Sequence, residues 1–316
     1  IAFGRIVSPD LDAQEKFLTD FGMVRAARTK DKLFMRGTDP EHHLHVTELG
    51  DPGFKGLAFY ARSEGDLETF SKTTEGASKI EEIDEPGGGK RVRALDPNGL
   101  EIEVIWGQET LAPLEVRKNK YNWGYEPTKR AGELMRMKTE PSHIKRSAHG
   151  VFITDKLEAT TKWYQGNLGF KTTDTIANPE DKDKAMAVFN HVDAPDENEY
   201  VDHHVFLFFE GPKLIYNHLS FEVADLDDVQ TGHHYMKEQG YKHAWGIGRH
   251  YLGSQIFDYW RDPWGRIHEH WTDSDMINNK HIPSMVSPEE GLQNQWGPDF
   301  QWSFIDEPSE HAIYGK

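Results

Sequence analysis

The sequence has 316 residues, 36% of them apolar and 28% charged, which is typical of a folded protein of more than one domain. Its formal net charge of −17 argues against a nucleic-acid groove, and no apolar run approaches the ~20 residues that span a bilayer. With no cysteine, thiolate metal sites, cysteine nucleophiles and disulfides are excluded, so any metal must be bound by nitrogen and oxygen. The same composition is compatible with a cytoplasmic location.

A first kind of strand–helix unit occurs twice. Residues 2–7 alternate as a strand and precede a helical pattern from Leu11 to Phe21. Residues 148–153 and the helical pattern from Leu157, closed by Gly169, have the same form. The first residue, Ile1, already lies in a predicted strand. We therefore expect that the natural protein has further residues before Ile1.

A second kind of unit also occurs twice, with predicted strands over residues 55–61 and 217–223. Each copy ends in an Asp-Pro-x-Gly turn, at residues 96–99 and 262–265, followed by an alternating strand. A helical stretch around residues 229–240 lies inside the later copy. The chain therefore predicts an α+β fold of four strand–helix–strands modules arranged in two pairs.

These repeats divide the chain. We expect a first domain over residues 1–108, a charged connector over 109–145, a second domain over 146–272 and a tail over 273–316. The tail has little period, but it contains several large aromatic residues, which indicate that it packs on the body of the protein. These residues are Trp296, Phe300, Trp302 and Phe304.

A candidate metal site emerges when the two domains are aligned through their repeats. The alignment sets His149, His218 and Glu269 opposite Phe3, Gly56 and Glu103. Two imidazoles and a carboxylate form the facial triad of non-haem Fe(II) oxygenases, which leaves one face of the metal open. A single histidine on a strand is more often structural than a ligand, but three ligand types recurring at equivalent positions favour a metal site. Glu103, without histidine partners, is expected to face water.

One stretch near the end of the second domain carries a family resemblance. Tyr259 follows His250 by nine residues, and Glu269 follows Tyr259 by ten, directly after the turn at residues 262–265. With this spacing the chain resembles the type I extradiol ring-cleaving dioxygenases of the vicinal oxygen chelate superfamily over nearly its whole length. That family includes catechol 2,3-, 2,3-dihydroxybiphenyl 1,2- and homoprotocatechuate 2,3-dioxygenases.

The resemblance implies a two-domain vicinal oxygen chelate fold, in which four βαβββ modules form incomplete barrels around one metal centre in the second domain. It implies Fe(II) as the cofactor, with Mn(II) as an alternative, because the same donor atoms serve both ions. It also implies O₂ and a catechol-type substrate as partners and a homo-oligomeric assembly. The reaction would be extradiol cleavage to a muconic-semialdehyde-type product in aromatic compound degradation.

Catalytic roles follow from the same resemblance. His204, fourteen residues before His218, would be the acid–base group, although its neighbour His203 is an alternative. Tyr259 and His250 would hydrogen-bond the substrate oxygen. Val151, residues 251–253, Trp245 and Phe206 are further pocket candidates. The remaining histidines are expected to be structural or solvated: His42, His43, His45, His233, His234, His268 and His270.

Two other functions remain open at this point. One is a metal-dependent glyoxalase-like isomerase of the same superfamily, whose sites often use two carboxylates. The other is a non-catalytic small-molecule-binding protein, which usually lacks an intact triad. The set formed by His204, His250 and Tyr259 favours the dioxygenase.

Overall fold

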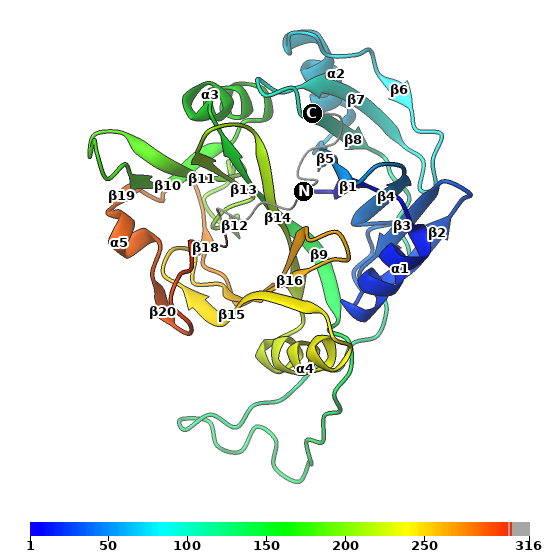
Figure 1. The fold of residues 1–316 in the computed structure, drawn as a ribbon, viewed down its shortest axis with the longest axis vertical. Coiled ribbons are helices and arrows are strands. Elements are labelled where there is room, and N and C mark those ends of the chain that lie inside the picture. The colour runs from blue at the N-terminus through cyan, green and yellow to red at the C-terminus, as the bar shows by residue number, and fades with distance from the viewer. Residues whose placement is uncertain (303, 305–316) are drawn as a thin grey trace.

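The computed structural model of the chain describes residues 1–302 and residue 304. Two large curved sheets dominate it, and the helices lie on their outer sides (Figure 1). The first sheet has eight strands, in the spatial order β2 (Val24–Arg28), β3 (Lys32–Arg36), β4 (His45–Leu49), β1 (Phe3–Ser8), β5 (Gly53–Tyr60), β8 (Glu101–Trp106), β7 (Lys90–Leu95) and β6 (Glu81–Glu82).

The second sheet is built from the later part of the chain. It has ten strands, in the order β19 (Ser284–Val286), β10 (Lys171–Ala177), β11 (Ala185–His191), β13 (Phe206–Glu210), β9 (Ile144–Thr154), β14 (Ile215–Val223), β17 (Ile267–Thr272), β16 (Ile256–Arg261), β15 (Lys242–His250) and β20 (Asn294–Trp296). A separate pair is formed by β12 (Val201–Asp202) and β18 (Met276–Ile277). The helices are α1 (Leu11–Asp20), α2 (Glu64–Thr73), α3 (Leu157–Leu168), α4 (Leu226–Glu238) and α5 (Pro288–Gly291).

The centres of the two sheets have the same topology. In the first, β1 pairs with β4 in parallel and with β5 in antiparallel, and β5 pairs with β8 in parallel. In the second, β9, β13, β14 and β17 repeat these pairings. The predicted α+β fold of four modules in two pairs is therefore confirmed.

Local sequence signals explain where the elements begin and end. The side chains of Asp10, Ser63 and Asp225 accept hydrogen bonds from the first backbone N–H groups of α1, α2 and α4. Helix α3 ends as predicted at Gly169, whose φ of 70° lies in the left-handed region that favours glycine. The Asp-Pro-x-Gly turn before β17 is fixed by Asp262, whose Oδ1 accepts from the backbone N–H of residue 264 at 2.9 Å.

The two halves share one core, and a buried arginine of the second half bonds to the first. Phe54 of the first half stacks on Tyr216 of the second, with ring centroids 4.7 Å apart. Arg266, which is fully buried, contacts Asp262 at 2.6 Å and donates to the backbone oxygen of Val7 at 2.6 Å. The guanidinium therefore joins the turn before β17 to the first strand of the other half.

Replacing Arg266 with methionine should lower the free energy of unfolding by about 3–5 kcal/mol, because Asp262 would be left buried without its cation. Urea denaturation followed by circular dichroism measures the loss. Lys162→Met, which breaks an exposed pair with Glu158, is the control and should leave the free energy of unfolding unchanged. Equal midpoints for both variants would contradict a structural role for the buried pair.

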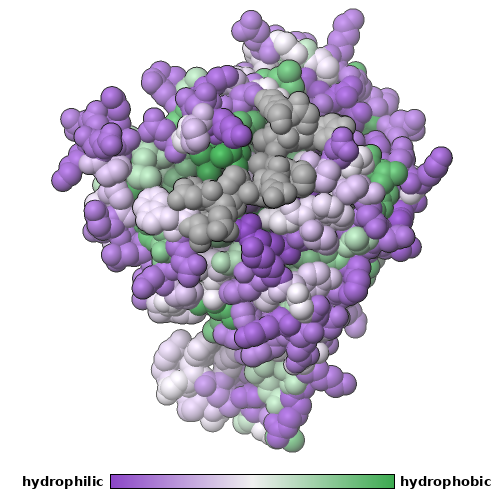
Figure 2. Space-filling view, in the orientation of Figure 1, coloured by the Kyte–Doolittle hydropathy of each residue, from purple (hydrophilic) through white to green (hydrophobic). Residues whose placement is uncertain are grey.

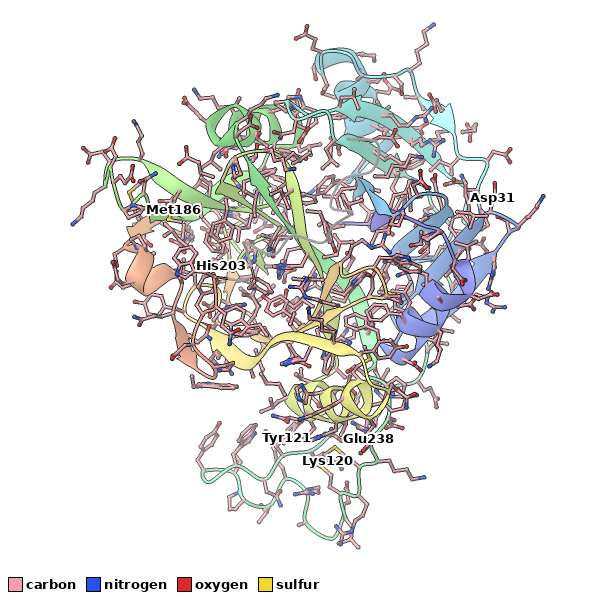
Figure 3. The ribbon with its side chains drawn as sticks, viewed as in Figure 1. Asp31, Lys120, Tyr121, Met186, His203 and Glu238 are labelled. Atoms are coloured by element: carbon pink, nitrogen blue, oxygen red, sulfur yellow. The ribbon has the colours of Figure 1, made fainter. Side chains whose placement is uncertain are left out.

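Two segments extend the body. Residues 109–143 run as irregular chain beneath α4, and the labels of Lys120 and Tyr121 mark them in Figure 3. The later segment adds β19 and β20 to opposite ends of the second sheet, while residues 303 and 305–316 of the predicted tail lie outside the described residues. Figure 2 shows a mostly hydrophilic face. None of the described helices combines the length and apolar content that a bilayer crossing requires.

Candidate metal centre

Three neighbouring central strands of the second sheet bring the predicted ligands together. His149 lies on β9, His218 on β14 and Glu269 on β17, and Ser220 of β14 pairs with Glu269 across the sheet. All three side chains are buried, with exposed fractions of 3%, 4% and 0%. Strand pairing therefore joins residues that are up to 120 positions apart in the sequence.

The ligand atoms have the spacing that one ion requires. His149 Nε2 lies 2.8 Å from Glu269 Oε2, and His218 Nε2 lies 3.5 Å from each of these two atoms. Donors bound about 2.1 Å from an ion at right angles lie about 3.0 Å apart, whereas donors on opposite sides lie about 4.2 Å apart. The three atoms therefore fit one face of a coordination shell and leave the other face open.

The charge of Glu269 also fits a cation. Burial opposes its ionisation, but His149 and His218 hold the pKa of Glu269 well below its usual range. Its nearest partners among the described residues are these two imidazoles, and no lysine or arginine pairs with it there. A buried carboxylate without a cation is costly, and a divalent ion would remove that cost.

A hydrogen bond orients one of the ligands. His218 Nδ1 lies 2.6 Å from Asn217 Oδ1, and since the amide oxygen only accepts, Nδ1 carries the proton. The lone pair of His218 is then on Nε2, which faces the other two ligands. Asn217 Nδ2 in turn donates to the backbone oxygen of Phe304 at 3.1 Å. Sequence reasoning missed Asn217, for which the adjacent Asn-His pair is the only signal.

The first half of the chain has a different arrangement at the equivalent positions. Glu103 occupies the position of Glu269, while Phe3 and Gly56 stand where His149 and His218 would be. The expectation that Glu103 faces water is wrong, because it is 2% exposed and accepts from Arg5 Nε at 2.8 Å. The paired strands bury the carboxylate, and the guanidinium supplies the positive charge.

A cavity opens beside the three ligands. It encloses about 590 Å³ of empty space including its mouth, a size suited to a small molecule. Its polar lining consists of histidines, one amide and one phenol, and its walls are apolar. The lining residues are His149, Val151, Phe189, His204, Leu207, Phe209, Asn217, His218, Trp245, His250, Leu252, Tyr259, Gly291, Leu292, Phe300 and Phe304.

Of the two adjacent histidines, His204 lines the cavity, and its ring lies 4.3 Å from that of His149. His203 is also buried but does not line the cavity, with Nε2 2.9 Å from Asp174 Oδ2 and Nδ1 3.1 Å from His204 Nδ1. Because Asp174 accepts the Nε2 proton of His203, His203 Nδ1 accepts from His204 Nδ1. His204 Nε2 then keeps its lone pair.

The other two predicted catalytic residues are in mutual contact. His250 Nε2 lies 2.8 Å from the Tyr259 hydroxyl, and both residues line the cavity. Burial, despite the opposing charge of Glu269, lowers the pKa of His250 to about 4, so its imidazole is neutral near pH 7. Burial and the charge of Glu269 raise the pKa of Tyr259 well above its ordinary value. Tyr259 therefore keeps its proton and remains a hydrogen-bond donor.

The remaining pocket candidates divide into two groups. Val151, Leu252 and Trp245 line the cavity. Phe206 lies in the core, and Tyr251 is 45% exposed. Sequence reasoning missed Phe189, Leu207 and Phe209, whose alternation on β11 and β13 is that of any half-buried strand.

Comparisons with known proteins match this architecture. Residues 146–267 match the model of the Glyoxalase/Bleomycin resistance protein/Dioxygenase superfamily. The chain is 29% identical to Metapyrocatechase 2 of Cupriavidus necator over 305 residues, which cover 94% of this chain and 88% of that protein.

Solved structures share the fold. The Mn(II)-bound glyoxalase from Novosphingobium aromaticivorans matches with a TM-score of 0.80 and 21% identity, over 100% of this chain and 95% of that one. A second match is the homoprotocatechuate 2,3-dioxygenase from Brevibacterium fuscum in complex with 3,4-dihydroxyphenylacetate. Its TM-score is 0.77 and its identity 18%, over 98% of this chain and 92% of that one. Residues 146–267 therefore carry a domain of the glyoxalase and dioxygenase superfamily, and the nearly full-length relative supports a type I extradiol dioxygenase.

Proposed function

We propose that the chain cleaves a catechol-type aromatic with O₂ beside its diol, giving a muconic-semialdehyde-type product in aromatic compound degradation. The observation that carries the proposal is the open triad of His149, His218 and Glu269 facing a cavity lined by His204 and Tyr259. The names of relatives such as Metapyrocatechase 2 support the same chemistry. An Fe(II) or Mn(II) ion held by the triad would supply adjacent binding positions and electron transfer between diol and O₂.

The residues around the triad would move protons. His204 Nε2, with its lone pair directed by His203, would accept a phenolic proton and later return it to the product. Burial lowers the pKa of His204 well below its ordinary value, so the base starts neutral. Tyr259, held by His250, would donate to the substrate oxygen and stabilise negative charge there.

The apolar walls define a substrate class. No lysine or arginine is among the described lining residues, so a carboxylate on the substrate would be buried without a cation. Alkyl groups would instead contact Val151, Leu207 and Phe189. We therefore propose a neutral catechol with an apolar substituent.

Steady-state kinetics of the Fe(II)-loaded chain under air test both the reaction and this preference. We expect 4-ethylcatechol to give O₂ uptake and a yellow ring-fission product, with kcat/KM at least about 100-fold above that of 3,4-dihydroxyphenylacetate. Equal values for the two substrates would reject the apolar preference alone. Absence of O₂ uptake and yellow product with every catechol would reject the dioxygenase reaction.

Two alternatives have less support. A glyoxalase-like isomerase shares the fold, but the described cluster at the centre offers a single carboxylate instead of two. A non-catalytic binding protein needs neither an open triad nor a base beside it. Self-association remains part of the proposal and is supported by exposed aromatic residues in the connector, such as Trp123 and Tyr125. A cytoplasmic location is likewise proposed, consistent with the absence of cysteine.

A further inference from the structure

A second cluster of ligand-type side chains lies behind the hairpin formed by β15 and β16. His233 comes from α4, His243 from β15 and Asp258 from β16. Side chains on a strand alternate between its two faces, so Asp258 points toward α4 while the next residue, Tyr259, points into the cavity. The cluster is therefore separated from the first centre by the thickness of the sheet.

The spacing of the cluster matches that of the first centre. His243 Nε2 lies 2.8 Å from Asp258 Oδ1, and His233 Nδ1 lies 3.1 Å from both carboxylate oxygens. One donor atom from each residue lies within 4.8 Å of the others. The expectation that both helix histidines are solvated is wrong for His233, which is only 16% exposed, whereas His234 is exposed.

The carboxylate of this cluster is oriented and lacks a permanent cation. Asp258 is fully buried, and Trp260 Nε1 donates to its Oδ2 at 2.6 Å, while its Oδ1 lies 2.8 Å from His243 Nε2 and 3.1 Å from His233 Nδ1. No lysine or arginine forms an ion pair with it in the part of the chain that the structure describes. A buried carboxylate requires a positive partner, and a divalent ion would provide one while both imidazoles stay neutral.

We propose that His233, His243 and Asp258 bind a second divalent transition-metal ion, of which Zn²⁺ is the representative. Two imidazoles and one carboxylate are donors that Zn²⁺ accepts, and three protein ligands leave a position for water. Solvent reaches the cluster beside His243, whose side chain is 32% exposed. The ion would fasten α4 to the hairpin that carries His250 and Tyr259.

Metal counting on the full chain tests the site without reference to ring cleavage. Metal-stripped protein is dialysed against Zn²⁺, and bound zinc is measured by mass spectrometry. We expect about two ions per chain in the wild type, about one in His243→Ala, about one in Glu269→Ala and none in the double variant. His243→Gln, which keeps the size of the side chain, guards against loss of folding.

Thermal unfolding gives a second readout. In the Glu269→Ala background Zn²⁺ should raise the unfolding midpoint, and adding His243→Ala should abolish that rise. One ion in the wild type and none in folded Glu269→Ala would show that the cluster is only a hydrogen-bonded network and would overturn the proposal. The dioxygenase proposal survives that result, because its ligands lie on the other face of the sheet.

Discussion

Replacing Glu269 with alanine should abolish iron binding at the first centre and, with it, ring cleavage. The triad would lose its only anionic ligand, and two imidazoles from β9 and β14 would remain. Iron per chain, counted in a His243→Ala background so that the second cluster does not contribute, should fall from about one to below about a tenth. Catechol-dependent O₂ uptake should fall below detection.

The repeat provides the matched control. Glu103→Ala removes the carboxylate at the equivalent position of the first half, where Arg5 takes the place of a metal. This variant should keep its iron but lose about 1–3 kcal/mol of stability, because Arg5 would lose one buried acceptor while keeping Glu48 and Glu85. Stoichiometric iron in Glu269→Ala would reject the triad as the metal site.

The fold was predictable because its signals are local and occur twice. The Asp-Pro-x-Gly turns, the capped helices and the alternating strands each appear in both halves, and the topology repeats with them. The three triad positions could be chosen from sequence because repetition supplies the comparison that a single module lacks. The spacing of 2.8–3.5 Å between their ligand atoms could not be predicted, because it depends on the pairing of strands that are distant in sequence.

Contacts between distant elements account for the failures. Nothing near Glu103 in the sequence indicates Arg5, which lies on another strand, so burial of Glu103 was not foreseen. Nothing near His233 indicates Asp258, so its position on a polar helix predicted a solvated side chain. The choice between His203 and His204 likewise required Asp174, which directs the first away from the cavity. In each case the decisive partner is a charged residue on a different element.

Replacing His204 with asparagine should lower kcat by about 10²–10⁴-fold while iron stays bound, because the base is lost and the ligands are untouched. The effect should fall on kcat more than on KM, since His204 moves a proton and the apolar walls hold the ring. Single-turnover measurements with 4-ethylcatechol under O₂, together with iron counts, separate the two effects.

The control again comes from the other half of the molecule. His43 occupies the position of His204 in the first sheet, with its ring 4.6 Å from Phe3, much as His204 lies 4.3 Å from His149. His43→Asn should leave kcat per bound iron unchanged, because no metal centre lies beside it. Unchanged turnover in His204→Asn would assign the base to another group of the cavity. Equal losses in both variants would instead attribute the effect to folding, since the two histidines differ chiefly in whether the proposed metal site lies next to them.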